Sequence, residues 1–325
     1  MPLVSSPALK KWIDQYLADH PLRSKSVVMT VFGDVITPHG GKVWLGSLID
    51  LLAPFGINDR LVRTSVFRLV EEGWLQAQRA GRRSNYSLHG ESAARFERAY
   101  QRVYAPAYRP WAGSWTLVFA NAEAISSGQR AELRKELLWE GYGVLAPSVF
   151  GHPTADGDTL KEIIARIGVQ QSVYVCNVAD SISAAHRPLQ DWVSQAWELE
   201  PVIANYMRFI QDFAVLPKHL GARVAIDPQQ AFVIRTLLVH EFRRVQLHDH
   251  QLPLELLPRN WPGKTAYDLC GRIYSMTSQA AERHVLQQLR GQDPSAPVAA
   301  SYFFQRFGGV ARTALKQGTK PGRDA

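Results

Sequence analysis

The sequence contains little cysteine and no long apolar run. Only two of its 325 residues are cysteine, Cys176 and Cys270; these are too few for a disulfide framework and lack metal-ligand spacing. Free thiols are typical of a reducing cytoplasm, where we expect this protein to act. No charge-free apolar run reaches the about 18 residues of a membrane span. Residues 1–20 carry Lys10 and Lys11 with no apolar segment behind them, so we expect no signal peptide.

Several enzyme signatures occur only as fragments. Residues 262–265 resemble the end of a phosphate-binding loop, but the glycine that should precede them is missing. Residues 141–146 match a dinucleotide motif by letters, although they follow a predicted helix where that fold requires a strand. His240 begins a zinc-protease motif whose second histidine is replaced by Arg244. We therefore expect no catalytic residues, no metal site, no cofactor and no enzymatic activity.

The chain is basic, and its positive charge is concentrated near the N-terminus. An apolar fraction of 46% suits globular domains with cores, and the net charge is +8. Residues 1–110 hold 15 basic and 9 acidic side chains, whereas residues 111–300 hold 17 and 19. This distribution indicates an anionic partner bound by the first third. Nucleic acid is favoured over a membrane surface, because no strongly basic amphipathic helix is present.

The N-terminal third has the pattern of a winged helix-turn-helix. Residues 24–36 are predicted to form its first helix, and residues 43–53 a second, apolar one. Pro54 and Gly56 break that second helix. Asn58 can cap a third helix that runs to about Glu72 and ends at Gly73. Two helices joined by a short turn match the geometry of DNA-reading motifs.

The third helix and the segment after it are predicted to face DNA. Leu61, Val62, Val66, Leu69 and Val70 are expected to share the inner face of that helix. The opposite face is expected to carry Asp59, Arg60, Arg63, Thr64, Phe67 and Glu71, with Arg68 on its flank. Residues 74–78 and 85–88 are predicted to form a hairpin around a basic tip at 79–83. A merely solvated basic surface is the competing interpretation. The predicted DNA contacts are Arg60, Arg63, Thr64, Arg68, Arg79, Arg82, Arg83 and Tyr86, with Arg63 or Thr64 reading bases and Arg82 and Arg83 at the tip.

The rest of the chain divides into a mixed and a helical part, so the fold class is α+β. The order strand-helix-strand-strand-helix-strand in residues 111–183 predicts a ferredoxin-like domain. Asp158 is expected to cap its second helix. Residues 189–213 show one helical pattern broken at Pro201, and Asp227 caps a further, nearly all-apolar helix. The predicted parts are an arm at 1–23, the DNA reader at 24–90, a linker helix at 91–110, the ferredoxin-like domain at 111–183, a helical domain at 184–311 and a basic tail at 312–325.

Three cationic or titratable side chains lie close together on that apolar helix. His240, Arg243 and Arg244 are spaced so that both arginines lie within reach of the histidine. A buried cation is costly without a partner. The partner is either an internal carboxylate, such as Glu255 or Asp268, or an anionic ligand.

Motifs along nearly the whole chain resemble, taken together, those of a known family. They lie at 41–48, 60–75, 81–86, 111–115, 139–148, 237–244, 252–258 and 302–309. In these motifs the sequence is similar to the PaaX-type transcriptional regulators, which repress phenylacetic acid catabolism. One departure is His250, where a proline is expected shortly before the Leu-Pro pair; it affects only the shape of that loop.

The resemblance implies both a domain plan and a function. It implies an N-terminal winged helix, a central domain similar to the Cas2 ribonuclease fold that helps to dimerise, and a helical C-terminal domain. It further implies a homodimeric repressor that binds a double-stranded DNA operator and is released by phenylacetyl-coenzyme A.

A pocket for such a thioester needs cations for its phosphates and apolar walls for its aromatic ring. The candidate effector residues are His240, Arg243, Arg244, Lys264, Arg272 and Trp261, with Trp192, Trp197, Tyr206 and Phe242 as further walls.

Two other functions remain open at this point. A metal-dependent nuclease would act through the Cas2-like domain, but such nucleases place an aspartate at the end of the first strand. Here that strand ends at Asn121, and the next acid is Glu123. The other alternative is a DNA-binding scaffold that responds to no ligand.

Overall fold

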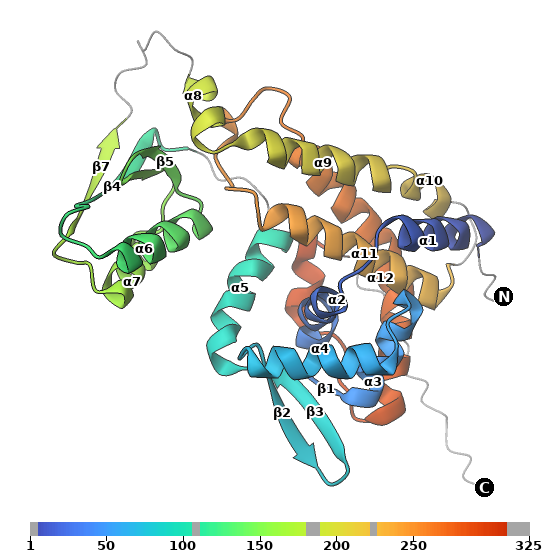
Figure 1. Ribbon diagram of the computed structural model, residues 1–325. Helices are drawn as coiled ribbons and strands as arrows, with labels where there is room; N and C mark the ends of the chain where they lie inside the picture. Colours follow the sequence, from blue (N-terminus) through green and yellow to red (C-terminus); the bar gives the residue numbers. More distant parts are fainter. Residues whose placement is uncertain (1–5, 106–110, 180–188, 222–225, 311–325) are drawn as a thin grey trace, which may run out of the picture. The chain divides into compact units, whose positions relative to one another are not determined.

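The computed structural model describes residues 6–105, 111–179, 189–221 and 226–310 (Figure 1). The predicted basic tail at 312–325 therefore lies outside the described residues. The chain forms two compact units. Unit 1 comprises residues 1–105, 213–241 and 268–325, and unit 2 comprises residues 106–212 and 242–267. The residues predicted as one helical domain at 184–311 are thus shared between the two units, and three helices of this region have residues in both.

Unit 1 contains the predicted winged helix. Val43 and Trp44, which were expected to begin a helix, instead pair with Tyr86 and Asn85 in a three-stranded sheet of order β1-β3-β2. Val43 is also buried, so strand pairing accounts for its extended conformation. The elements are α2 (Ser24–Val31), a π-helical turn (Phe32–Ile36), a 3-10 turn (Thr37–His39), β1 (Lys42–Trp44), α3 (Leu45–Leu52), a second 3-10 turn (Ala53–Phe55), α4 (Asp59–Glu71), β2 (Leu75–Ala80) and β3 (Arg83–Leu88).

The two ends of α4 lie where the sequence predicted them. The Asn58 side chain accepts a hydrogen bond of 3.0 Å from the Leu61 amide, which satisfies one of the unpaired first-turn donors. At the other end Gly73 has a φ of 72°, and the amides of Gly73 and Trp74 donate to Val70 and Leu69. This left-handed ending suits glycine, which has no side chain to clash.

The inner face of α4 is narrower than predicted. Val62, Val66 and Leu69 are almost completely buried, but Leu61 is 45% exposed. Successive residues are rotated by about 100° around a helix, so Leu61 lies beside the buried row and outside it. The prediction that Leu61 belongs to the core face was wrong.

Further helices complete unit 1. Helix α1, predicted as part of an arm, packs against the rest of unit 1. The ring centroids of Trp12 and Tyr16 lie 5.5 and 5.4 Å from that of Phe213. Helix α5, predicted as a linker, buries Val103 and Tyr104. The elements are α1 (Pro7–Asp19), α5 (Gly90–Tyr104), α10 (Leu216–Leu220), most of α11 (Pro228–Gln246) and of α12 (Gly263–Gln292), and a 3-10 turn (Ser301–Gly308).

A buried carboxylate joins these helices to the winged helix. Asp34, in the π-helical turn after α2, is 1% exposed. Its Oδ1 accepts hydrogen bonds from Arg306 Nη1 at 2.9 Å, from Tyr104 at 2.7 Å and from Tyr274 at 2.9 Å. Arg235 Nε lies 3.2 Å from its Oδ2. Because buried charge requires such partners, the first helix of the winged helix is fixed to α5, α11, α12 and the last turn.

A second carboxylate extends this network. Glu282 accepts from Arg235 Nη1 at 2.7 Å and lies 3.0 Å from His39 Nε2. Burial alone would raise the pKa of Glu282, but Arg235 and His39 outweigh it and lower that pKa to about 2. Glu282 is therefore ionised at neutral pH and shares Arg235 with Asp34.

Unit 2 begins with the predicted ferredoxin-like domain. Its four antiparallel strands have the order β5-β6-β4-β7, and α6 and α7 cover one face of the sheet (Figure 1). The cap of α7 is Asp156, not Asp158 as predicted, since Asp156 Oδ1 accepts from the Asp158 amide. The elements are β4 (Ser114–Ala120), α6 (Ser127–Trp139), β5 (Gly143–Ala146), β6 (Val149–His152), α7 (Gly157–Ile167) and β7 (Val173–Ala179).

Two further helices belong to unit 2, α8 (Leu189–Ala196) and most of α9 (Leu199–Phe213). The helical pattern breaks at Glu198, whose φ is 48°, and not at Pro201. Pro201 lies in the first turn of α9, where a missing N–H removes no helical hydrogen bond. Within the described ranges, no helix is both long and apolar enough to cross a membrane.

Candidate nucleic-acid interface

Helix α4 presents a row of exposed side chains on the side away from the core of unit 1. The predicted contacts Arg60, Arg63, Thr64 and Arg68 are all exposed. Arg63, Thr64 and Arg68 follow Arg60 by three, four and eight residues, so neighbouring members lie on one surface of the helix. Since buried Val62, Val66 and Leu69 hold the opposite side, the exposed row is oriented for a partner.

An ion pair orients one of these arginines. Arg63 Nε lies 2.6 Å from Asp59 Oδ1, and Arg63 Nη2 lies 3.2 Å from Asp59 Oδ2. Both side chains are more than half exposed, so the pair adds little stability. Its effect is on geometry: the carboxylate takes one edge of the guanidinium and leaves the Nη1 side for a base or a phosphate. Thr64 differs, because its hydroxyl donates to the Arg60 carbonyl at 2.9 Å and can offer a partner only its acceptor capacity.

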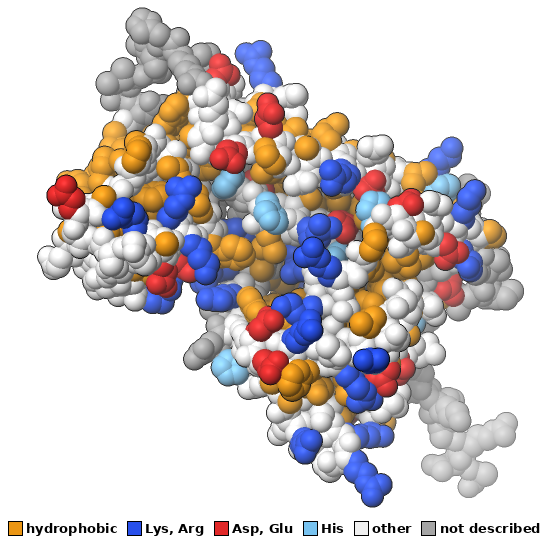
Figure 2. Space-filling view, in the orientation of Figure 1, with side chains coloured by type: hydrophobic (Ala, Val, Ile, Leu, Met, Phe, Trp, Pro, Cys, Tyr) orange, Lys and Arg blue, Asp and Glu red, His pale blue; other side chains and the backbone are white. Residues whose placement is uncertain are grey.

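Strands β2 and β3 form a hairpin with a basic end. Ala80 pairs with Arg83, so the turn contains only Gly81 and Arg82, and Gly81 has a φ of 62°. Glycine at the first turn position is typical of a tight two-residue hairpin turn. Figure 2 shows Lys and Arg side chains at the end of this hairpin, and its two strands carry no acidic residue.

The structure separates the two arginines predicted at the tip. Arg82 lies in the turn, whereas Arg83 is the first residue of β3. The guanidinium of Arg83 lies over the ring of Trp44, 5.9 Å from its centroid, which gives that arginine a cation–π partner within the protein. Arg79 is exposed on β2. Of these three arginines, Arg82 is the one placed at the extremity.

One aromatic residue departs from its predicted role, and another was left out of the predicted contacts. Tyr86 is half-buried in the sheet, opposite Val43 and Ala77, so it supports the hairpin and does not lie at its end. Phe67 was placed on the outer face of α4 but was not included among the predicted contacts. It is 62% exposed. Its spacing from Arg63 and Thr64 was the signal that could have identified it.

The candidate effector residues are not brought together within one unit. His240 and Arg272 belong to unit 1, whereas Arg243, Arg244, Lys264 and Trp261 belong to unit 2. His240 is buried, and its Nδ1 lies 3.0 Å from the hydroxyl of Thr30. The same hydroxyl lies 3.1 Å from the Ser26 carbonyl, so Thr30 joins the imidazole to the backbone of α2. This bond ties α11 to α2 and gives His240 a structural role.

The aromatic residues proposed as pocket walls are packed inside unit 2. Trp197, Tyr206, Phe242 and Trp261 are all buried, and Trp192 is half-buried. The ring centroids of Tyr206 and Trp261 lie 5.6 Å apart, and the Tyr206 hydroxyl donates a hydrogen bond to Asp249. Trp197 Nε1 donates to the Gly141 carbonyl at 2.8 Å. These contacts are those of core residues.

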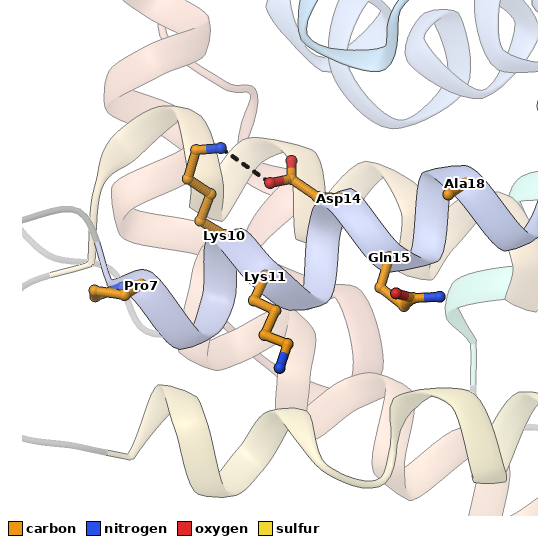
Figure 3. Close-up of a pocket in the computed structure, with 6 residues that line it drawn as sticks. All are labelled: Pro7, Lys10, Lys11, Asp14, Gln15 and Ala18. Carbon is orange, nitrogen blue, oxygen red and sulfur yellow. Dashed lines mark hydrogen bonds and ion pairs between the residues drawn. The ribbon is translucent and has the colours of Figure 1, made fainter.

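Two hollows lie on the surface of unit 1, and neither is lined by a candidate effector residue. One, of about 420 Å³, is lined by six residues of α1 alone, including Lys10, Lys11 and Asp14 (Figure 3). Because one helix face lines it, it is an open depression. The other, of about 540 Å³, lies beside α4 and is lined in part by Leu22, Phe55 and Leu61.

The nuclease alternative gains no support from unit 2. Strand β4 ends at Ala120, and the next acidic residue, Glu123, is exposed beyond it. Among the described residues, no group of three or more histidines, cysteines or carboxylates is placed to hold a metal ion.

Comparison with known proteins covers both units. Family models match residues 23–92 as "PaaX-like protein", residues 108–190 as "PaaX protein central Cas2-like domain" and residues 197–287 as "PaaX-like protein C-terminal domain". The transcriptional repressor PaaX of Escherichia coli K12 is 36% identical over 291 residues, which span 89% of this chain and 92% of the relative. The solved structure of the uncharacterized protein Rv0674 from Mycobacterium tuberculosis is 26% identical, with a TM-score of 0.51, over 79% of this chain and 98% of the other.

Proposed function

This chain belongs to the PaaX family of transcriptional regulators, and on that premise we propose that it represses genes of phenylacetic acid catabolism by binding their operator DNA through α4 and the β2–β3 hairpin. The observation that carries the proposal is the exposed arginine row of α4 beside a hairpin with an arginine at its end. In a winged helix, α4 enters the major groove and the hairpin reaches the adjacent backbone or minor groove. Phosphate neutralisation then supplies affinity, and base contacts supply specificity.

The second part of the proposal is that the repressor binds as a homodimer. A dimer with two-fold symmetry places its two α4 helices about 34 Å apart, one turn of DNA. Footprinting should then show two half-sites related by a dyad. Protection of one asymmetric half-site, or a monomer on DNA in sedimentation, would contradict the dimer.

The third part concerns release, for which phenylacetyl-coenzyme A is the proposed effector. A ligand can release DNA only if it binds the DNA-free arrangement more tightly than the bound one. Membership of the family supports this class of effector, and the phosphate groups of coenzyme A require cationic side chains. Arg243 and Arg244, half-buried and exposed in unit 2, remain the candidates for this contact.

Gel shifts on the promoter of the aromatic-acid operon, with and without the thioester, test the whole proposal. We expect a discrete complex that phenylacetyl-coenzyme A dissolves and free phenylacetate does not, because the free acid lacks the phosphate anchors. A thermal-shift panel of acyl-coenzyme A thioesters checks binding directly, since a ligand of the folded state raises the melting temperature. A specific complex that no thioester weakens would instead identify a ligand-independent DNA-binding protein.

A further inference from the structure

Phe67 is the one large aromatic side chain on the exposed face of α4, beside the row formed by Arg60, Arg63, Thr64 and Arg68. Its side chain is 62% exposed. A single exposed apolar residue is by itself ordinary, so its position is what matters. Phe67 follows Arg63 by four residues and Thr64 by three, which are the spacings of neighbours on one helical face. The aromatic ring therefore belongs to the same surface as the arginine that is expected to read bases.

The chemistry of the major groove contains one apolar feature that such a ring can recognise. Each base edge presents hydrogen-bond donors and acceptors there, and thymine adds its C5-methyl group. Apolar side chains, phenylalanine among them, contact that methyl group in protein–DNA complexes. We propose that Phe67 determines sequence specificity by packing against a thymine methyl group of the operator. This inference rests on the proposed DNA-binding function.

The geometry of α4 predicts how far the thymine contacted by Phe67 lies from the base contacted by Arg63. Asp59 holds Arg63 by one edge of its guanidinium, so the Nη1 side is presented to a base, and arginine pairs best with guanine. Four residues along a helix span about 6 Å, and base pairs are stacked about 3.4 Å apart. The thymine should therefore lie about two base pairs from the guanine in each half-site.

Charge favours DNA over a protein partner on this face. Between residues 60 and 83 there are six arginines and two acids, a balance that attracts a polyanion. A protein partner is the alternative, and the experiment below separates the two. Leu61 provides a matched control, because it is also apolar and 45% exposed on α4. It lies six residues from Phe67, about 120° around the helix, and lines the hollow with Leu22 and Phe55.

The test uses the full-length protein and the promoter fragment that it protects in footprinting. Each thymine pair related by the dyad is replaced in turn by deoxyuridine, which removes only the C5-methyl group, and the dissociation constant is measured by fluorescence anisotropy at fixed salt. At one thymine position, we expect the deoxyuridine replacement to weaken binding of the wild-type protein about fourfold per half-site. This is the change in affinity that corresponds to burial of one methyl-sized group. Phe67→Ala should bind both forms equally, whereas Leu61→Ala should keep the wild-type preference.

Other results would overturn the inference. It is wrong if wild-type protein binds every deoxyuridine form as tightly as the parent, or if Phe67→Ala retains the preference for thymine. A change of oligomeric state in Phe67→Ala with unaltered discrimination would assign this residue to a protein contact. Phe67→Ser, which also removes the ring, should behave as the alanine variant does. If wild-type protein protected no promoter fragment, the proposed function itself would fail, and that result is distinct from binding without methyl discrimination.

Discussion

Removing the buried carboxylate of Asp34 should destabilise unit 1 strongly. Asp34 pairs with two guanidinium groups, those of Arg235 and Arg306, and all three side chains are inaccessible to solvent. Asp34→Ala leaves Arg306 without a carboxylate partner among the described residues and leaves Arg235 with Glu282 alone. Removing one member of a buried ion pair costs about 3–5 kcal/mol, because the remaining charge stays desolvated. We expect a loss of at least this size in the free energy of unfolding.

The assay is equilibrium unfolding in urea, followed by tryptophan fluorescence, with Asp14→Ala as the matched control. Asp14 also forms an ion pair, with Lys10 at 2.9 Å, but both side chains are more than 60% exposed. Such a pair contributes about 0–1 kcal/mol. A double variant, Asp34→Ala with Arg306→Met, should recover part of the loss because it removes one unpaired cation. If Asp34→Ala cost no more than Asp14→Ala, the network would not stabilise the fold as argued.

Three further predictions concern acid stability and the DNA interface. Glu282 has a pKa of about 2 in the folded protein against 4.5 ordinarily. Its contribution to the free energy of unfolding, roughly 3 kcal/mol, is therefore present above pH 4.5 and lost as the pH falls toward 2. Glu282→Gln should lose less stability than wild type between pH 5 and pH 2.5 in urea titrations, and parallel curves for the two proteins would contradict this. Arg63→Ala should weaken operator binding by about 1–3 kcal/mol and leave binding to random DNA almost unchanged; equal losses in anisotropy titrations would mean a phosphate contact. Arg82→Ala should reduce the log–log salt slope of binding by about one unit, whereas Arg83, held over Trp44, should change it less; an unchanged slope for Arg82→Ala would remove the hairpin end from the interface.

The sequence by itself determined the elements whose causes are local. Asn58 and Gly73 mark the ends of α4 because a side-chain acceptor and a left-handed φ act within a few residues of the chain. The segments on either side of the basic residues 79–83 likewise predicted the hairpin, although its strands extend to Ala80 and Arg83 and leave a turn of two residues. The strand and helix order predicted the ferredoxin-like sheet. The exposed arginines of α4 followed from the same periodicity, since a face opposite to a buried row must meet solvent or a partner.

The tertiary structure alone decided what depends on distant partners. Val43 and Trp44 became a strand through pairing with residues more than 40 positions later, and local pattern does not contain that pairing. Asp34 found its partners up to 272 positions away, so no spacing in the sequence could indicate the buried network. The candidate effector residues were chosen by residue type, and the structure assigns them to two different units, because the sequence does not show which remote segments pack together. Residue type and local period specify which side chains face inward, but contacts between remote segments depend on how the helices pack.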